Sequence, residues 1–264
     1  MSLSRHATTI GEQFTLQAEM FAKSPILHAD AALSLMVEAG APICSDAMLD
    51  VACGPGSVVA AYAPYVSTAT GVDATSAMLD QAQKLANEKC LTNVSWLRGN
   101  IYELPFADAA FDIVTCRYAF HHLENLSAAF QEMLRVCGPG GRIVVCDGIA
   151  SADSHQADAF NAMERFRDPS TVAFRTLAHL EDLFADAGVT ALVSRRYNHR
   201  ASMRRLLENS FPLNGDREGL RRLIETSIEG DLFGLNSRRD GDDVLMDLPI
   251  VILAAQKPST PGPD

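Results

Sequence analysis

Short apolar runs alternate with segments of helical periodicity through the first 150 residues of the chain. Apolar runs of about four to eight residues favour buried strands, whereas apolar residues three and four positions apart favour helices that cover a sheet. The pattern predicts strands near 47–52, 67–73, 94–98, 111–117 and 141–149, and helices near 57–65, 75–89 and 126–137. Strands that alternate with helices predict an α/β fold, in which a parallel sheet has helices on both faces.

The two ends of the chain follow a different rhythm. Residues 8–40 read as two helices separated near Lys23-Ser24-Pro25, because proline suits a helix start and serine a cap. After residue 150 the pattern predicts helices at 153–166 and 177–187, a strand at 189–197, two more helices within 200–230 and a last strand at 245–255. The proline-rich tail at 258–264 is expected to be disordered.

Composition limits the class of protein. A chain of 264 residues with 47% hydrophobic content fits one globular domain, and no apolar run reaches membrane-spanning length. The net charge of −11 argues against broad nucleic-acid binding. Residues 1–6 lack an apolar signal segment, and the six cysteines are scattered without a C-x-x-C motif. We therefore expect a cytoplasmic protein with buried free thiols and no membrane insertion.

A glycine-containing turn links the first predicted strand to the next helix. Residues 49–56 read LDVACGPG, and the following five residues, SVVAA, begin a helical pattern. Gly54 has no side chain to block a ligand that approaches the backbone, and Gly56 precedes a helix whose first N–H groups lack partners within the helix. This context predicts a nucleotide-like ligand at the carboxyl end of the strand.

The residues around the turn narrow the class of ligand. The dinucleotide fingerprint G-x-G-x-x-G needs a third glycine where this chain has Val59. Asp50 would repel a pyrophosphate, but it can hold an ammonium group directly or through water. Asp73, at the end of the second strand, is placed to accept hydrogen bonds from two ribose hydroxyls. A nucleoside that carries an amino-acid ammonium and no phosphate fits both carboxylates, and S-adenosylmethionine is such a compound.

Four motifs occur in an order that one enzyme family shares. They are LDVACGPG at 49–56, GVDATSAML at 71–79, RGNIYELPFADAAFDIVTCRYAFHHL at 98–123 and RVCGPGGRIVVCD at 135–147. With them the chain resembles the class I S-adenosylmethionine-dependent methyltransferases, in particular the branch similar to ubiquinone and menaquinone biosynthesis enzymes (methyltransferase type 11). The resemblance covers about residues 10–190 and is weaker over 195–245. It indicates the fold and the cofactor but not the substrate.

The resemblance implies the fold in more detail. The family has a Rossmann-like, doubly wound sheet of seven strands that is mostly parallel and has an antiparallel last strand. The helical segment 200–230 then becomes an insertion before that strand. We expect a single methyltransferase domain over residues 1–264. Its parts are an N-terminal helical cap (1–45), a cofactor-binding core (46–150), substrate-side helices with the last strands (151–257) and the tail (258–264).

The resemblance also implies cofactor contacts. Ala74 and Met78 would flank the adenine, although Met78 also belongs to an apolar helical stripe. Asn100 stands where the family commonly has an acid, and its amide oxygen can accept the same hydrogen bond from the adenine amino group; a local turn former is the alternative. The Arg117 carbonyl would accept from the methionyl ammonium, while its side chain can pair with Asp50 or Asp112. The expected cofactor-binding residues are Asp50, Ala52, Gly54, Pro55, Gly56, Asp73, Ala74, Met78, Asn100, Ile101, Arg117 and His122.

A histidine doublet, His121 and His122, follows the fourth predicted strand. Histidine can take a proton near neutral pH, and His121 is the candidate general base for the methyl acceptor. Related proteins carry the doublet with different acceptors, so packing against the cofactor or orientation of a loop is the alternative. Neither histidine has the helical spacing or the neighbouring cysteines of a metal site, and no metal is expected.

Apolar and aromatic residues outside the motifs are candidates for the acceptor side. An N-terminal helix with Phe14, Gln17 and Phe21 would cover the cofactor and exclude water, with core packing as the alternative. The candidate substrate residues are Phe14, Phe21, Phe160, Met163, Tyr197 and Met203. Phe166, Leu207, Phe211 and Phe233 extend this candidate wall.

Methyl transfer from a sulfonium needs in-line positioning and exclusion of water, because the leaving group departs neutral. We expect transfer to a small-molecule acceptor, planar or lipophilic, such as a secondary metabolite or a quinone-like compound. The alternatives are a protein or RNA acceptor, a non-catalytic cofactor-binding module and a nicotinamide-dependent dehydrogenase. The acidic charge argues against a protein or RNA acceptor. The missing third glycine and Asp50 argue against the dehydrogenase. A monomer or homodimer is expected.

Overall fold

The computed structural model describes residues 5–23 and 31–259. One sheet runs through the protein in the order β3-β2-β1-β4-β5-β9-β7, with β6 paired to β5 and β8 paired to β9. The strands are β1 (Ala47–Val51), β2 (Thr68–Asp73), β3 (Val94–Arg98), β4 (Phe111–Arg117), β5 (Cys137–Ala150), β6 (Arg175–Thr176), β7 (Thr190–Ser202), β8 (Arg238–Asp240) and β9 (Asp243–Gln256). The seven predicted strands are all present, and β6 and β8 are short additions.

The strand directions are those of the Rossmann-like fold. Strands β1 to β5 pair in parallel, whereas β9 runs antiparallel to both β5 and β7. The helices are α1 (Arg5–Lys23), α3 (Ala31–Gly40), α4 (Ser57–Tyr62), α5 (Ser76–Glu88), α6 (Leu126–Val136), α7 (Ser154–Arg167), α8 (Leu177–Asp186), α9 (Met203–Glu208) and α10 (Arg217–Thr226). The predicted doubly wound architecture with an antiparallel last strand is thus confirmed.

Side chains alternate between the two faces of the sheet and build a core on each. In β5, Ile143 and Val145 belong to the core under α6 and α8, whereas Val144 and Cys146 belong to the core under α3 and α4. This alternation follows from the two-residue period of a strand. The near-continuous apolar runs of the central strands are therefore explained by burial on both faces.

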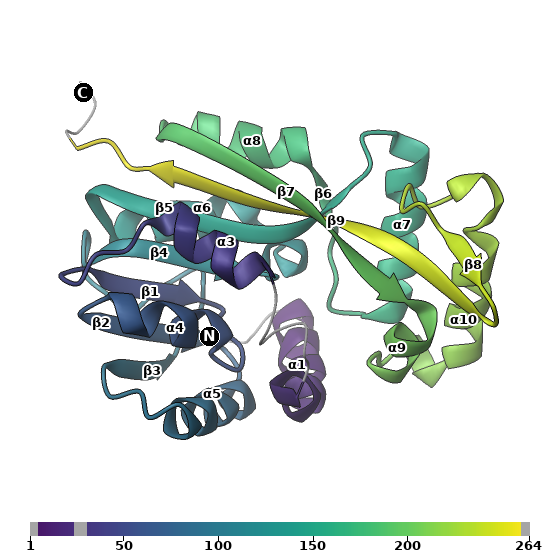
Figure 1. The fold of residues 1–264 in the computed structure, drawn as a ribbon, viewed down its shortest axis with the longest axis horizontal. Helices are drawn as coiled ribbons and strands as arrows, with labels where there is room; N and C mark the ends of the chain where they lie inside the picture. The colour runs from purple at the N-terminus through teal and green to yellow at the C-terminus, as the bar shows by residue number, and fades with distance from the viewer. Residues whose placement is uncertain (1–4, 24–30, 260–264) are drawn as a thin grey trace.

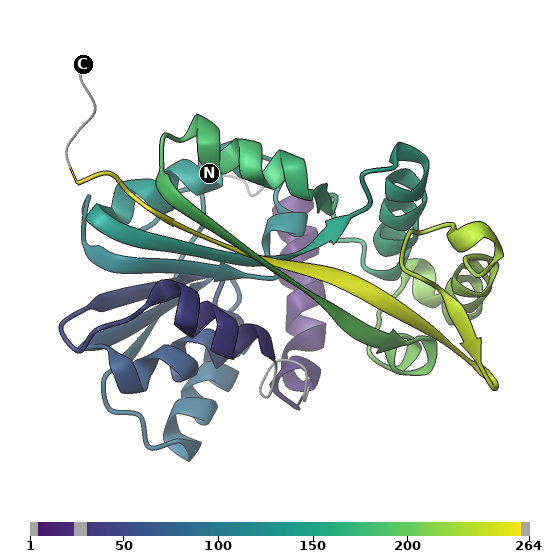
Figure 2. The ribbon, with the colours of Figure 1, turned by 45° about the horizontal axis from the view of Figure 1, so that its top comes forward.

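Strands β7 and β9 continue past the parallel sheet as a long antiparallel arm (Figure 1). The arm carries α9, α10 and β8, and α7 packs beside them, so that these elements form a cap with a hydrophobic core of its own. Helix α1 lies between the parallel sheet and the cap in both views (Figures 1 and 2). The fold thus brings helix α1, helix α7 and the β7–β9 arm, which are far apart in the sequence, to the same end of the parallel sheet.

Several predicted boundaries are wrong. Strand β7 continues to Ser202, where a helix was expected from residue 200, because it pairs with β9 as far as Leu245. Strand β5 begins at Cys137 rather than near residue 141, so the glycine-rich segment 138–141 belongs to the strand. The helix break was expected near residues 24–25, which lie outside the described residues, as do residues 260–264 of the tail.

Two further expectations meet a mixed outcome. All six cysteines are free, but Cys44 and Cys90 are exposed rather than buried. Each sits in a connection before or after an element rather than in an apolar strand. No helix among residues 5–23 and 31–259 combines the length and apolar character that a membrane span requires.

Candidate active site

The turn after β1 is tied to the end of β2 by one carboxylate. The backbone N–H of Gly54 donates to Oδ2 of Asp73 at 2.9 Å, and the N–H of Thr75 donates to Oδ1 at 2.8 Å. The parallel register of β1 and β2, in which Val51 lies opposite Val72, brings the two strand ends together. Two residues that the sequence singles out separately therefore meet at one edge of the sheet.

The two glycines of the turn have different surroundings. Both have left-handed backbones, with φ of 51° at Gly54 and 84° at Gly56. A Cβ added at Gly54 would meet no atom within 4 Å, whereas one at Gly56 would lie 2.7 Å from Trp96 and 2.9 Å from Ala82. Gly56 does not line the cavity described below, because helix packing against α5 and Trp96 occupies that side. Gly54 alone opens towards a ligand.

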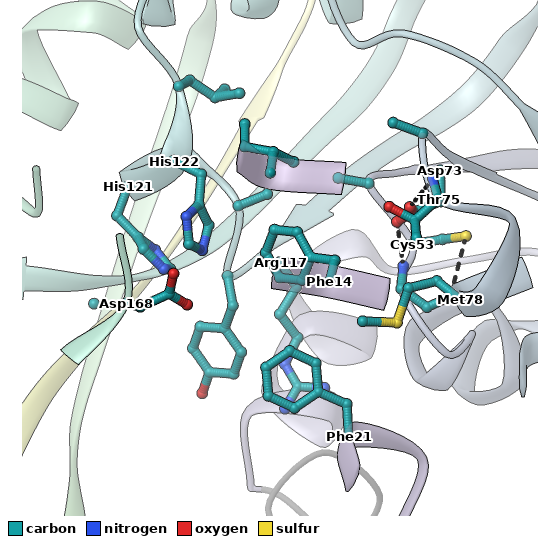
Figure 3. Close-up of a pocket in the computed structure, with 18 of the residues that line it drawn as sticks. Phe14, Phe21, Cys53, Asp73, Thr75, Met78, Arg117, His121, His122 and Asp168 are labelled. Carbon is teal, nitrogen blue, oxygen red and sulfur yellow. Dashed lines mark hydrogen bonds between the residues drawn. The ribbon is translucent and has the colours of Figure 1, made fainter. Parts of the chain in front are cut away.

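A cavity of about 1730 Å³ lies over the carboxyl ends of β1, β2 and β4. Figure 3 shows Asp73, Thr75 and Met78 on one side and His121, His122 and Asp168 on the other, with Phe14 and Arg117 between them. The expected cofactor-binding residues on its wall are Asp50, Ala52, Gly54, Pro55, Asp73, Ala74, Met78, Asn100, Ile101, Arg117 and His122. The expected acceptor-side residues on its wall are His121, Phe14, Phe21 and Phe160.

Two carboxyl groups, one buried and one half-buried, lie at the β1–β2 end of this cavity. Asp50 is 1% exposed, and Oγ1 of Thr115 donates to its Oδ1 at 2.6 Å. Burial is the main cause that raises the pKa of Asp50 to about 7, and Thr115 offsets part of this effect. Burial also raises the pKa of Asp73, against the hydrogen bonds from Thr75 and Gly54. A cationic ligand at this end would relieve the cost of both charges.

The residues expected around the adenine also make contacts within the protein. The Asn100 side-chain oxygen accepts a hydrogen bond from the Tyr102 N–H at 3.1 Å, which is the turn-forming role considered above. An amide oxygen has two lone pairs, so one site remains for a ligand. Met78 is 1% exposed and lines the cavity, so it serves both as core and as wall. The Arg117 guanidinium lies 4.7 Å from the centre of the Tyr118 ring.

The two histidines have different partners. Nδ1 of His121 lies 2.7 Å from Oδ1 of Asp147, and the His121 N–H donates to Oδ2 of Asp147 at 3.0 Å. Nδ1 of His122 lies 3.0 Å from the carbonyl oxygen of Ser170. Burial, and then the neighbouring His121, lower the pKa of His122, so this ring stays neutral. Asp147 is the residue that sequence reasoning missed, although it ends the fourth motif.

Six aromatic rings follow one another along the cavity wall between α1 and α7. Neighbouring ring centres are 4.1 to 6.2 Å apart. In order, the rings belong to Phe21, Phe14, His122, His121, Phe174 and Phe160. We call these six residues the aromatic row. Phe174 is a further residue that sequence reasoning missed, because the loop before β6 has no apolar periodicity.

Helix α1 is anchored to the histidine side of the cavity. Nε2 of Gln17 donates to Oδ2 of Asp168 at 3.1 Å, and both residues are buried. The Nε2 atom of His6 lies 2.8 Å from the His122 carbonyl oxygen. Phe14 meets the His122 ring edge-on at 5.0 Å. These contacts hold the helix across the cavity, as a cover over the cofactor side would require.

Three candidate substrate residues lie away from the cavity wall. Met163 and Met203 are buried in the hydrophobic core of the cap, because their helices turn these side chains towards α10 and β9. The Tyr197 hydroxyl lies 3.1 Å from the Tyr118 hydroxyl, and its ring packs against the α3–α4 core. The wall also lacks Phe166, Leu207, Phe211 and Phe233. These residues were chosen because they are apolar or aromatic, and composition alone does not tell the wall of a cavity from a core.

A metal site has no support in the described part of the chain, where no three His, Cys, Asp or Glu side chains are grouped to hold an ion. The cavity instead offers carboxylates at one end, histidines at the other and an open backbone turn. These features suit a nucleoside with a positive charge and an adjacent organic acceptor. The residues present therefore fit the ligand that the sequence motifs suggest.

Comparison with known proteins identifies the class. Residues 49–145 match the family described as a methyltransferase domain. The methyltransferase YcgJ of Bacillus subtilis is 35% identical over 172 residues, which cover 65% of this chain and 68% of YcgJ. The crystal structure of YcgJ superposes with a TM-score of 0.78 at 27% identity, covering 87% of this chain and 99% of that one. A demethylmenaquinone methyltransferase of Listeria welshimeri is 29% identical over 162 residues, which cover 53% of this chain and 69% of that protein.

The fold and the site define a class I S-adenosylmethionine-dependent methyltransferase, and the chain belongs to this methyltransferase family. Within it, the chain is similar to the branch that contains the menaquinone biosynthesis enzymes. Its cofactor is S-adenosylmethionine, and its reaction requires a methyl acceptor.

Proposed function

We propose that this methyltransferase acts on a planar or lipophilic small molecule that lies along the aromatic row. The observation that carries the proposal is the unbroken series of six rings on the wall of a 1730 Å³ cavity. Pockets for small molecules are concave and mostly apolar, with a few placed polar groups. Ring faces and edges provide favourable contacts for a flat apolar acceptor.

In this proposal the β1–β2 end holds the cofactor, which supplies the sulfonium methyl group. Asp73 accepts the ribose hydroxyls with the lone pairs that its two backbone donors leave available. Asp50 and the Arg117 carbonyl face the ammonium, Asn100 and Ile101 the adenine, and Gly54 lets the nucleoside approach the backbone. Helix α1 excludes water above the transferring group through Phe14 and Phe21.

A small molecule is favoured over a protein or RNA acceptor. Helix α1 and the cap border the same cavity from two sides, which suits a molecule that enters it entirely. The net charge of −11 opposes an RNA chain at the entrance. The similarity to a demethylmenaquinone methyltransferase supports a flat, lipophilic acceptor for this chain. A monomer or homodimer remains our expectation.

The cofactor side is tested by calorimetry with S-adenosylhomocysteine. We expect saturable binding by the wild type, and a loss of at least about 100-fold in affinity for Asp73→Ala, whose carboxylate charge-assisted bonds are removed. Asp112→Ala is the matched control, because Asp112 also accepts a backbone N–H, from Ala47 at 2.9 Å, but lies outside the cavity wall. Equal affinities of the two variants would refute the assignment of Asp73.

The acceptor class is tested with cofactor that carries a labelled methyl group. The protein is incubated separately with a lipophilic small-molecule extract, with total protein and with total RNA of one cell lysate. We expect label in the organic-soluble fraction of the first incubation. Label that appears only in protein or RNA would refute the proposed acceptor class without affecting the cofactor assignment.

A further inference from the structure

The side chain of Asp147 holds the His121 ring and selects its tautomer. The carboxylate accepts from the His121 N–H at 3.0 Å, lies 2.7 Å from its Nδ1, and accepts from the Gly148 N–H at 2.7 Å. Asp147 is 1% exposed and stands near the carboxyl end of β5. Three contacts from two adjacent segments therefore hold this carboxylate in one orientation.

This arrangement determines which ring nitrogen of His121 carries the proton. An ionised carboxylate can only accept hydrogen bonds, so Nδ1 of His121 must be the donor. In the neutral ring Nε2 then keeps its lone pair. Among the described residues, no group bonds Nε2 of His121, and the ring lines the cavity. Phe174 stacks on the ring, with centres 4.2 Å apart and planes at 10°, and fixes its tilt.

His122 does not share these features. Its Nδ1 donates to the Ser170 carbonyl, and burial together with the adjacent His121 lowers the pKa of its ring. A ring that resists protonation is a poor acceptor for a proton. Charged groups that line the cavity near the histidines include Glu124, Asp168, Glu164 and Arg167, and Glu164 is paired with Arg167. His121 is thus the group with a carboxylate behind it and the cavity in front.

We propose that His121 is the general base of this methyltransferase and that the acceptor is an aromatic hydroxyl, with Asp147 as a positioning residue. The inference rests on the proposed function and narrows its acceptor to O-methylation. The O–H bond breaks and its proton moves to Nε2, while the oxygen forms a bond to the methyl carbon. The carbon–sulfur bond breaks with its electron pair going to sulfur, and the imidazolium is stabilised by Asp147 until it releases the proton to water.

The first test reads the tautomer without turnover. In protein with ¹⁵N-labelled histidine, bound to S-adenosylhomocysteine, we expect the His121 signals of a protonated Nδ1 and an unprotonated Nε2, assigned by their loss in His121→Gln. Asp147→Asn should shift the ring towards the Nε2–H tautomer, because its amide N–H can donate to Nδ1. An Nε2–H tautomer in the wild type would overturn the proposal.

The second test separates proton removal from a structural role. Methylation of 1-naphthol is compared with that of a nitrated naphthol that is already ionised at the assay pH. His121→Gln and Asp147→Asn should lower kcat for 1-naphthol by about 100-fold or more, yet change kcat for the ionised acceptor only a few-fold, because no base is needed there. His179→Gln, on the exposed face of α8, is the matched control and should change neither rate.

The outcomes distinguish this inference from the proposed function. Equal losses with both naphthols would show that the two residues are structural, and wild-type methylation of 1-naphthylamine in place of 1-naphthol would show a different acceptor class. Either result overturns the proposal while cofactor binding stands. If none of these probes is methylated, the proposal is judged by the His121 tautomer measured in the cofactor-bound protein. Failure to bind S-adenosylhomocysteine would instead refute the proposed cofactor site.

Discussion

Asp50 shows at the scale of one residue how a binding site opposes stability. Burial raises its pKa from an ordinary 3.8 to about 7. The folded protein therefore binds more protons here than the unfolded chain between these two values, so that the free energy of unfolding falls as the pH rises through this window. Above pH 7 the full cost of the buried charge is present. Such a cost is expected where a cation of the ligand compensates it.

The variant Asp50→Asn should therefore stabilise the ligand-free protein. Asparagine keeps an oxygen for the Thr115 hydroxyl and removes the charge. Since one pKa unit corresponds to about 1.4 kcal/mol, we expect the gain in unfolding free energy to grow from about pH 4 and to level off above pH 7, at about 1–4 kcal/mol. Urea denaturation at several pH values measures it. A variant that is less stable at pH 8 would contradict this interpretation.

The same residue predicts the pH dependence of cofactor binding. If the charged form holds the ammonium, the wild-type affinity for S-adenosylhomocysteine should fall by up to about tenfold per pH unit below 7. The Asp50→Asn variant should bind more weakly at pH 8 and lose this dependence. Calorimetric titrations of both proteins between pH 5.5 and 8 provide the comparison, and parallel pH profiles would exclude Asp50 from the ammonium site.

In the β1–α4 turn, the two glycines share a left-handed backbone but differ in their surroundings. An alanine at either position costs about 1–2 kcal/mol in the left-handed region. Gly54→Ala adds a methyl group to open cavity, whereas Gly56→Ala drives one into Trp96 and Ala82, for about 1–3 kcal/mol more. We expect Gly54→Ala to lose mainly cofactor affinity and Gly56→Ala mainly thermal stability. The opposite ranking in calorimetry and melting experiments would contradict the roles given to them.

Helix α1 is an element whose position can be tested through one buried polar contact. The bond from Gln17 to Asp168 is buried, and Gln17→Ala removes it and leaves a buried carboxylate with one donor fewer. We expect faster amide hydrogen exchange over residues 8–20 and a several-fold faster dissociation of S-adenosylhomocysteine. Gln83→Ala is the control, because Gln83 bonds Asn87 on the exposed side of α5. Unchanged exchange and dissociation would show that α1 is not a cover.

The elements differ in how well the sequence specifies them. The central strands were predicted because burial on both faces leaves continuous apolar runs, as in 111–117. The second half of β7, from Arg195 to Ser202, is mostly polar because it forms the edge of the arm, so its only signal is the register with β9. Local periodicity does not report such a long-range pairing, so the strand was predicted to end at residue 197 and a helix was predicted from residue 200.

The candidate site was predictable to the extent that its residues follow strand ends. Gly54 and Asp73 meet because parallel strands place their carboxyl ends at one edge, which topology alone requires. Asp147 also ends a strand motif, but its role depends on a partner 26 residues earlier in the chain. Met163 and Met203 were misplaced because the cap has a separate core, which amphipathic spacing cannot distinguish from the wall of a cavity.

At the scale of the whole molecule, the separation of the cap core from the two cores of the sheet predicts two levels of stability. Ile224 of α10 is fully buried in the cap core, and Ile113 of β4 is fully buried beneath α3 and α4. Replacing either by alanine removes the same groups and should cost about 2–5 kcal/mol. For Ile224→Ala we expect faster hydrogen exchange confined to the cap, because sub-global units open independently.

The same pair of variants separates cofactor binding from the acceptor side. Gly54 directly follows Cys53, which belongs to the core that contains Ile113, and Gly54 is bonded to Asp73. Neither residue belongs to the cap core, so Ile224→Ala should keep the wild-type affinity for S-adenosylhomocysteine but lose methylation of the acceptor. Ile113→Ala should destabilise the whole sheet and weaken the binding of cofactor. Hydrogen exchange that rises across the core as well as the cap in Ile224→Ala would show one cooperative unit, and the cap would then hold the cofactor site in shape as well as the acceptor.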